Sequence, residues 1–217
     1  MNRTWLTQRG APDVVIIMLG WAATPQAVMH LQLPGCDVLA VHHYTDGLEP
    51  LRAAEFAAYR RVYLVAWSYG VWAAEQCCRE LPLHRAIAFN GTPFPADERY
   101  GMRLRASLRA MQAAAHGSLP TPAELPGPYA EPTPAEKLAE LTRLAEWSRC
   151  DSAAHLRWHA AYIADQDEIF PPARMRAYWQ SVGLGTEYSG RHYPFADPAL
   201  LLRALDLEEE ALPTAHA

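Results

Sequence analysis

The feature that most constrains this chain is an apolar run that leads through a single serine into a helical pattern. Residues 62–67 are typical of a strand buried in a parallel sheet, Ser68 follows directly, and residues 69–81 are predicted to form a helix. A strand, a sharp turn through serine and a helix form a nucleophile elbow, which holds the hydroxyl clear of its neighbours. Ala66 and Gly70, two residues before and after the serine, are small enough for strand and helix to approach closely. Alone, this pattern is a weak signal, because a serine in an ordinary strand-to-helix turn gives it too.

Strands and helical segments alternate through residues 1–93 and again after residue 158. This alternation with short connections is typical of an α/β fold with a mostly parallel sheet. Asp197 is expected to cap the last helix, and the tail after Glu208 is expected to be frayed. The predicted strands cover residues 4–8, 14–19, 38–42, 62–67, 86–89, 159–164 and 186–188, and the predicted helices cover residues 25–31, 50–59, 69–81, 173–182 and 197–205.

The middle of the chain breaks this alternation. Residues 99–116 and 136–147 are predicted helices, a proline-rich loop over residues 119–134 joins them, and no strand is expected in this part. In an open α/β sheet, such a block lies over the carboxyl ends of the strands, where ligands bind. We therefore interpret residues 1–217 as one domain in which residues 94–157 form a lid or cap insertion.

A nucleophilic serine needs a base within hydrogen-bond reach, and the base needs an acid that fixes its tautomer. On α/β-hydrolase folds the three residues follow the order serine, acid, histidine. The chain offers Ser68, then Asp167 in a loop after a predicted strand, then His192 in the loop after the next predicted strand. Asp165 and Glu168 are alternative acids, since acidic residues before a helix often only cap it. We prefer Asp167, because Asp165 can simply end its strand.

The other histidines carry weaker signals, among nine in the chain. His42 and His43 are adjacent at a strand end, so their side chains are expected on opposite faces, which disfavours joint metal binding. His155 and His159 are four residues apart but lack an H-E-x-x-H pattern. The sequence therefore predicts neither a metal site nor a cofactor.

An oxyanion hole requires backbone N–H groups aimed at the oxygen that becomes negative. One donor is expected from Tyr69, the residue after the serine, at the start of its helix. The other should come from the loop after an early strand, and we assign it to the Trp21 amide in the Gly20-Trp21 loop. An H-G-G-G string is absent from the sequence.

Composition excludes several function classes. A formal net charge of −5 gives no reason to expect a nucleic-acid partner. No apolar run reaches membrane-spanning length, and no signal peptide is recognisable at the N-terminus. The four cysteines lack C-x-x-C spacing, so we expect reduced thiols in a cytoplasmic protein.

Five segments together resemble the BioG-type pimeloyl-acyl-carrier-protein methyl ester esterases: L-G-W-A-A-T-P, V-A-W-S-Y-G-V-W-A-A-E, F-N-G-T, D-E-I-F-P and G-R-H-Y-P-F. The resemblance spans nearly the whole chain in order and is weakest in the proline-rich middle. It implies an α/β-hydrolase that releases methanol from the methyl ester of pimeloyl-acyl carrier protein in biotin biosynthesis, through an acyl-serine. Ser68, Asp167 and His192 would be nucleophile, acid and base, with the amides of Trp21 and Tyr69 as oxyanion hole. Tyr69 stands where the family pattern leads us to expect methionine, which leaves the shape of the pocket open.

The resemblance also implies an acidic partner, an acyl carrier protein whose phosphopantetheine carries the methyl pimeloyl group. Arginines recur in the predicted helix over residues 99–116, with no acid nearby, and are candidates to bind this partner. An equal alternative is that these arginines only form a solvated helix face. A broader short-chain carboxylesterase or thioesterase, or a non-catalytic acyl-binding protein, are the alternative functions. The candidate arginines are Arg99, Arg103, Arg105 and Arg109, and the candidates for an apolar acyl slot are Trp21, Trp67, Trp72, Phe94 and Tyr129, each of which is equally expected in the core.

Overall fold

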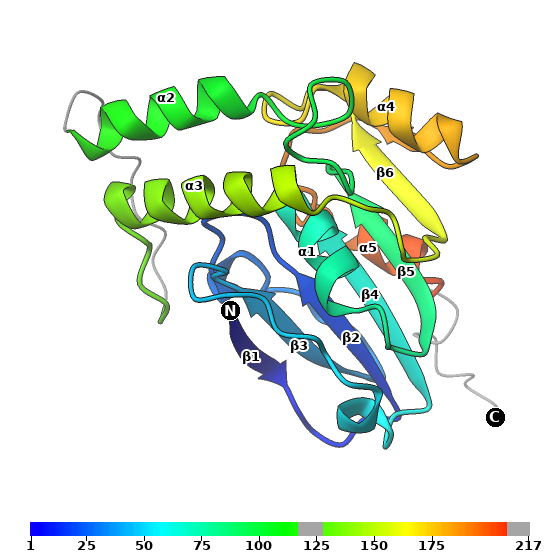
Figure 1. The fold of residues 1–217 in the computed structure, drawn as a ribbon. Helices are drawn as coiled ribbons and strands as arrows, with labels where there is room; N and C mark the ends of the chain where they lie inside the picture. Colours follow the sequence, from blue (N-terminus) through cyan, green and yellow to red (C-terminus); the bar gives the residue numbers. More distant parts are fainter. Residues whose placement is uncertain (117–127, 208–217) are drawn as a thin grey trace, which may run out of the picture.

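A computed structural model describes residues 1–116 and 128–207 of the chain (Figure 1). Within these residues a seven-stranded sheet has the order β1-β3-β2-β4-β5-β6-β7. Only the edge strand β1 is antiparallel to its neighbour, so the predicted, mostly parallel α/β sheet is confirmed. The strands are β1 Asn2–Thr7, β2 Asp13–Met18, β3 Cys36–His42, β4 Arg61–Trp67, β5 Leu83–Phe89, β6 Ala160–Ala164 and β7 Thr186–Tyr188.

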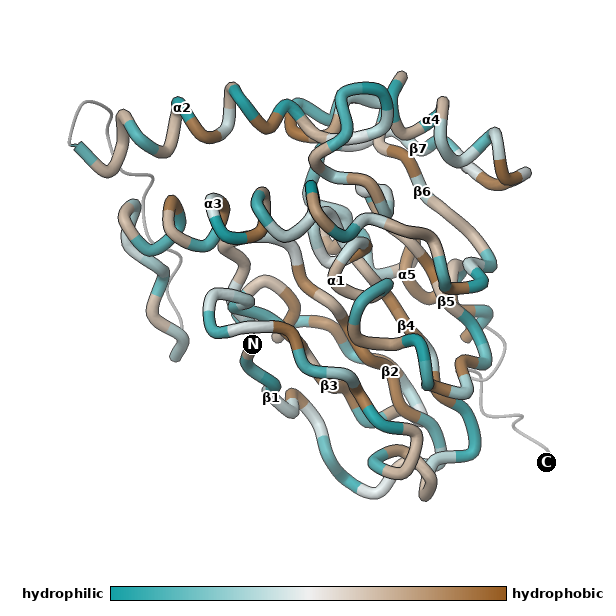
Figure 2. Tube along the Cα trace, viewed as in Figure 1, coloured by the Kyte–Doolittle hydropathy of each residue, from teal (hydrophilic) through white to brown (hydrophobic). Residues whose placement is uncertain are grey.

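The central strands β2 and β4 are apolar after their first residue because helices or loops cover both faces of the sheet. Alternate residues of β2 point to opposite sides, so Ile16 joins one core and Ile17 joins the other, and both are fully buried. Figure 2 shows the same inner strands as the most hydrophobic part of the trace. Burial on both faces explains why continuous apolar runs, rather than alternating ones, marked these strands.

Three helices pack on the sheet. α1 Tyr69–Cys77 and α4 Pro172–Ser181 contribute to one core, and α5 Pro198–Leu205 contributes to the other. α5 begins as predicted, because the Asp197 carboxylate accepts the Ala199 N–H at 3.0 Å.

The predicted helices over residues 25–31 and 50–59 are wrong. These segments contain only the short 3₁₀ turns η1 Pro25–Ala27 and η2 Ala53–Phe56. The buried side chains of Val28 and Phe56 pack on the two cores, and the irregular backbone around each turn lets them reach the sheet. The helix predicted over residues 69–81 also ends early, at Cys77.

Two helices lie between β5 and β6, at the end of the sheet where the parallel strands have their carboxyl ends (Figure 1). They are α2 Leu104–Ala115 and α3 Pro134–Cys150. Among the described residues between β5 and β6, no strand occurs. α3 begins with a capping box in which Thr133 and Glu136 each bind the other's backbone N–H. Part of the predicted proline-rich loop and the predicted frayed tail lie outside the described residues. Across the parts of the chain that are described, no helix is both long and apolar enough to cross a bilayer.

Candidate active site

Ser68 occupies the sharp turn between β4 and α1. Its backbone has φ 60° and ψ −126°, a conformation that non-glycine residues rarely adopt and that persists only where the surroundings enforce it. Gly70 provides one such constraint, since a Cβ there would lie 2.1 Å from the Met18 carbonyl oxygen and 2.7 Å from that of Leu19. The absent side chain lets the start of α1 rest directly on the end of β2, as the small-residue pattern predicts.

Ser68, His192 and Asp167 form a continuous chain of hydrogen bonds. His192 Nε2 lies 2.9 Å from Ser68 Oγ, and His192 Nδ1 lies 2.7 Å from Asp167 Oδ2. Because a carboxylate only accepts, the neutral imidazole carries its proton on Nδ1, and Nε2 is free to accept from the serine hydroxyl. The carboxylate is completely buried, whereas the imidazole is 20% exposed. The arrangement has the geometry of a nucleophile, a general base and an orienting acid.

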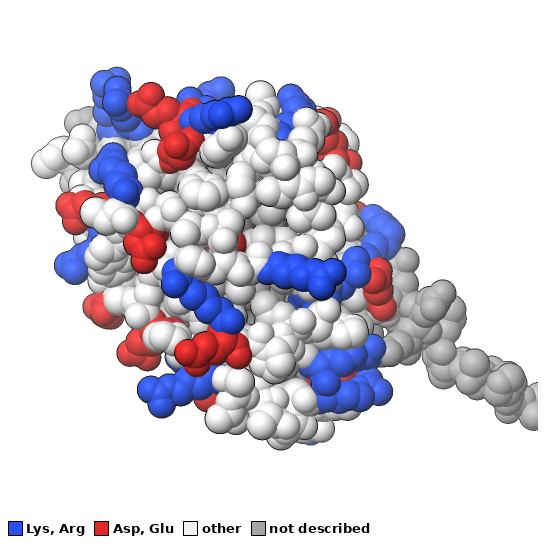
Figure 3. All heavy atoms as spheres, turned by 45° about the vertical axis from the view of Figure 1, so that its right-hand side comes forward, with Lys and Arg blue, Asp and Glu red and all other residues white. Residues whose placement is uncertain are grey.

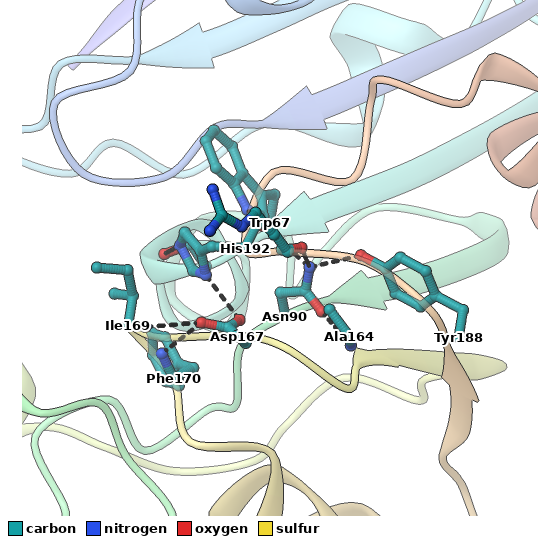
Figure 4. A network of polar contacts seen from close by, with 10 residues as sticks. Trp67, Asn90, Ala164, Asp167, Ile169, Phe170, Tyr188 and His192 are labelled. Atoms are coloured by element: carbon teal, nitrogen blue, oxygen red, sulfur yellow. Dashed lines mark hydrogen bonds and ion pairs between the residues drawn. The ribbon is translucent and has the colours of Figure 1, made fainter.

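Of the three acidic candidates, Asp167 is the one that meets the histidine. Its Oδ1 also accepts the N–H groups of Ile169 and Phe170, each at 2.8 Å, which fixes the carboxylate (Figure 4). Asp165 is exposed and accepts the Gly190 N–H at 3.0 Å. Glu168 is exposed as well, so burial and contact separate Asp167 from both alternatives.

Aromatic rings enclose the histidine. The Phe170 ring lies parallel to the imidazole with centroids 6.2 Å apart, and the Trp67 ring lies 5.4 Å away at an angle of 45°. Trp67, a candidate for the acyl slot, therefore borders the site. The candidate Trp72 is instead a core residue, since it is 1% exposed and its indole N–H donates to the Asp151 carbonyl. Phe94 packs against Tyr178 on the side of α4.

The loop after β2 runs directly beside the serine. A Cβ on Gly20 would lie 2.9 Å from Ser68 Cβ and 3.3 Å from Ser68 Oγ, so the Trp21 amide follows a residue in contact with the candidate nucleophile. The Tyr69 amide occupies the first position of α1, where an N–H has no acceptor inside the helix. Tyr69 thus follows Ser68 in the chain, and Gly20, the residue before Trp21, approaches Ser68 in space. The Tyr69 ring is buried away from solvent, and that burial raises the pKa of its hydroxyl to about 12.

α3 holds the same loop through two contacts that were not predicted from the sequence. The Trp21 indole N–H donates to the Lys137 carbonyl at 2.7 Å, and the buried Glu140 carboxylate accepts the Ala22 N–H at 2.9 Å. Glu140 also accepts the Tyr44 N–H at 2.7 Å. Glu140 lies one turn before the buried Leu144, and a carboxylate at such an apolar position was the available signal in the sequence.

The segment that follows α3 is fastened to α1 by another buried carboxylate. Glu75 accepts the N–H groups of His155 at 2.6 Å and Leu156 at 2.8 Å, and the indole N–H of Trp158 at 2.7 Å. Burial raises the pKa of this carboxyl, although its three donors oppose the shift. Together with the contacts to the β2 loop, these bonds tie α3 to the body of the protein at both ends.

Side chains suited to a metal do not gather in the described residues: residues 1–116 and 128–207 contain no group of three His, Cys, Asp or Glu that could hold an ion. His42 is buried against Thr4 Oγ1 at 3.1 Å, and burial, His43 and the N-terminal amine lower its pKa to about 4. Cys36, Cys77 and Cys78 are buried, and burial raises the pKa of the Cys77 thiol to about 12. His42, Cys77 and Cys78 are therefore neutral near pH 7.

The four candidate arginines are exposed, and the expectation that no acid lies near them is wrong. Glu98, which directly precedes the helix predicted over residues 99–116, forms an ion pair with Arg105 at 3.1 Å. Arg99 precedes α2 and its guanidinium stacks over the Tyr100 ring. A hollow of about 390 Å³ lies beside them, and its charged lining consists of Arg103, Arg105, Arg149, Arg174, Asp97 and Glu98.

Comparisons with known proteins agree with this architecture. Residues 1–114 match the family model described as "Pimeloyl-ACP methyl esterase BioG". An uncharacterised Haemophilus influenzae protein is 31% identical over 196 residues, which cover 84% of this chain and 89% of that protein. The crystal structure of BioG from Haemophilus influenzae superposes with a TM-score of 0.73 and 28% identity, covering 90% of this chain and 95% of that one.

A Bacteroides fragilis protein named malonyl-[acyl-carrier protein] O-methyltransferase is 29% identical over 202 residues, which cover 83% of this chain and 39% of that protein. The chain therefore matches about two-fifths of that longer protein. The sheet order, the helical insertion and the structural similarity confirm the predicted α/β-hydrolase fold. The chain belongs to the BioG family of pimeloyl-ACP methyl esterases.

Proposed function

We propose that this chain hydrolyses the methyl ester of pimeloyl-[acyl-carrier protein] to pimeloyl-[acyl-carrier protein] and methanol, as a cytoplasmic step of biotin biosynthesis. The observation that carries the proposal is the hydrogen-bonded chain from Ser68 through His192 to Asp167 in a member of the BioG family. Family membership supports the substrate, and the contacts support the chemistry.

In the first half of the reaction, His192 Nε2 takes the proton of the Ser68 hydroxyl as Oγ attacks the ester carbonyl carbon. The carbonyl oxygen becomes negative and accepts hydrogen bonds from the amide N–H groups of Trp21 and Tyr69. These bonds strengthen as the charge on the oxygen grows. Asp167 stabilises the imidazolium that forms. Methoxide is a poor leaving group, so His192 protonates the departing oxygen and methanol leaves.

In the second half, water replaces methanol beside the imidazole. His192 takes a proton from the water as its oxygen attacks the acyl-serine carbon, and the same two amides hold the second tetrahedral intermediate. Collapse of that intermediate returns the proton to Ser68 Oγ and releases the pimeloyl carboxylate. The cycle consumes one water and needs neither a metal nor a cofactor.

Substrate selection is assigned to the insertion over residues 94–157, acting as a lid over the carboxyl ends of the strands. α3 would be its fixed part, because its contacts reach the loop after β2, and α2 would border the entrance. Trp67 beside the imidazole, Trp21 in the loop and Tyr129, which borders a hollow of about 150 Å³ with residues 22–25, are the remaining candidates for the acyl slot. The carrier itself is expected to contact the outer side of α2.

Acidic side chains of the carrier protein would meet Arg99, Arg103, Arg105 and Arg109. The view in Figure 3 presents acidic and basic groups interspersed on one face, so steering would depend on local groups rather than on the net charge. Arg149 and Arg174 extend the set around the hollow beside α2, and the Arg103 N–H donates to the Ile169 carbonyl in the acid loop. That hollow could receive a phosphate group of the carrier's prosthetic arm.

The proposal is tested by growth of a biotin-requiring bacterium that lacks its own methyl esterase. The wild-type chain is expected to restore growth without biotin, and Ser68→Ala, expressed at an equal level, is expected not to. Failure of the wild-type chain, or rescue by Ser68→Ala, would count against the proposed reaction.

A further inference from the structure

Asn90 directly follows β5 and is buried, at 1% exposure. Its backbone has φ 49°, in the left-handed region where asparagine is among the few tolerated non-glycine residues. Its own N–H donates to the Tyr162 carbonyl of the adjacent strand β6 at 3.0 Å. The side chain therefore starts from a fixed point at the carboxyl edge of the sheet.

The side-chain amide has one consistent orientation, because its partners are of opposite kinds (Figure 4). Oδ1 accepts the Ala164 N–H at 2.8 Å, whereas Nδ2 lies 2.9 Å from the His192 carbonyl oxygen and 2.6 Å from the Tyr188 hydroxyl. The Arg191 carbonyl is a third, longer partner of Nδ2, at 3.3 Å. A reversed amide would set its oxygen against two carbonyls and its NH₂ against an N–H.

His192 lies in a loop outside any helix or strand, and two residues earlier the Gly190 carbonyl of this loop accepts the Gln166 N–H at 3.0 Å. The His192 carbonyl accepts two N–H groups, from Trp67 Nε1 at 2.7 Å and from Asn90 Nδ2 at 2.9 Å. Trp67 ends β4 and immediately precedes Ser68, and Asn90 directly follows β5. The two hydrogen bonds therefore fix the His192 backbone relative to the ends of both strands. The 2.9 Å separation of Nε2 and Ser68 Oγ depends on that position, since an imidazole has only two side-chain torsions.

The oxygen of the same amide binds Ala164, at the end of the strand that leads into the loop of Asp167. Ala164 ends β6, and Asp167 follows three residues later in the loop. We propose that Asn90 is a positioning residue, whose amide joins the histidine loop to the start of the acid loop and helps to hold them at the separation that the Ser68–His192–Asp167 contacts require. The inference rests on the proposed function for the role of His192 as base, but not for the identity of the substrate.

Asn90→Asp tests the proposal with little change in shape, because aspartate also tolerates the left-handed backbone. An ionised carboxylate only accepts, so it loses the bond to the His192 carbonyl and repels that oxygen. Tyr188, Asp165, Asp167 and His192 are the titratable groups nearby, so rates are measured at one pH near 8. With p-nitrophenyl butyrate, we expect kcat per site titrated with a fluorophosphonate to fall on the order of 100-fold, with KM changed by less than about threefold.

Two further variants separate positioning from folding. Tyr188→Phe removes a partner of Asn90 that is not part of the histidine backbone, and kcat should stay within about threefold of wild type. Asn90→Gly keeps the left-handed backbone without the amide, and kcat per titrated site should fall as in Asn90→Asp. The proton resonance of His192 Nδ1–H, visible without turnover, should shift or broaden in both Asn90 variants and persist in Tyr188→Phe.

The outcomes distinguish this inference from the proposed function. A wild-type enzyme that neither releases methanol from methyl pimeloyl-[acyl-carrier protein] nor reacts with the fluorophosphonate would overturn the proposed function. An active wild-type enzyme with unchanged kcat and an unchanged imidazole resonance in both Asn90 variants would overturn only the positioning role. Absence of folded protein in both variants would also overturn it, because Asn90 would then be a folding determinant.

Discussion

Asp167→Asn is the substitution whose effect follows most directly from the contacts. Oδ1 of Asp167 accepts two backbone N–H groups, from Ile169 and Phe170, each at 2.8 Å. In the variant, the amide oxygen takes this place, because an NH₂ group cannot accept. The NH₂ group then faces His192 Nδ1, which must become an acceptor, and the imidazole proton moves to Nε2. There it points at Ser68 Oγ, so the histidine can no longer take the serine proton.

The expected size of the effect is large for catalysis and small for stability. Loss of the correct tautomer is expected to lower kcat about 10⁴-fold. At about 1.4 kcal/mol for each factor of ten, this loss corresponds to about 5.5 kcal/mol of transition-state stabilisation. The backbone hydrogen bonds of the acid loop persist, so the free energy of unfolding should change by no more than about 1 kcal/mol.

Initial rates on a chromogenic short-chain ester, with urea unfolding of the same samples, measure both quantities. Asp165→Asn is the matched control: the residue is exposed, and an amide oxygen can still accept the Gly190 N–H. Its kcat should stay within about fivefold of wild type. The reasoning is refuted if Asp167→Asn stays active while Asp165→Asn is the variant that loses its activity.

Three further predictions concern the supports of the site. Glu140→Gln leaves one of the N–H groups of Ala22 and Tyr44 facing an NH₂ group, so urea unfolding should show a loss of about 1–3 kcal/mol and ester turnover should drop; wild-type values for both would refute the role given to this carboxylate. Gly70→Ala must push α1 away from β2 by more than about 1 Å, so kcat should fall on the order of 100-fold, and a crystal structure with α1 unmoved would contradict this. Because the pKa of His42 is lowered from 6.5 to about 4, its contribution to stability is present above pH 6.5 and lost as the pH falls toward 4; in His42→Gln the decline measured by unfolding over that range should be smaller, by up to about 3 kcal/mol, and an unchanged decline would assign it to other groups.

The sequence was informative where burial alone dictates structure. Strands covered on both faces must be apolar where they are covered, so the continuous apolar runs of β2 and β4 could be recognised without their partners. The helices expected over residues 25–31 and 50–59 failed because their local pattern competes with tertiary packing. Val28 and Phe56 reach the two cores from short 3₁₀ turns instead.

The order of serine, acid and histidine was also visible, but the supports of the site were not. Asn90 and His192 are 102 residues apart in sequence, and Glu140 and Ala22 are 118 apart. Periodicity reports which face of an element is buried, and it contains no information about which distant backbone group a polar side chain will meet. The choice between Asp165 and Asp167 likewise depended on which carboxylate is buried beside the imidazole.

The central claim is that Ser68 attacks the methyl ester of a carrier-linked pimeloyl group. The most direct measurement is methanol release from methyl pimeloyl-[acyl-carrier protein] and, in parallel, from free monomethyl pimelate, by the wild-type chain and by Ser68→Ala. We predict a kcat/KM for the carrier-linked ester that is on the order of 100-fold higher or more, because binding energy from the carrier is available only there, and no release above background by Ser68→Ala. Equal turnover of the free ester, or methanol release by Ser68→Ala at the wild-type rate, would contradict the claim.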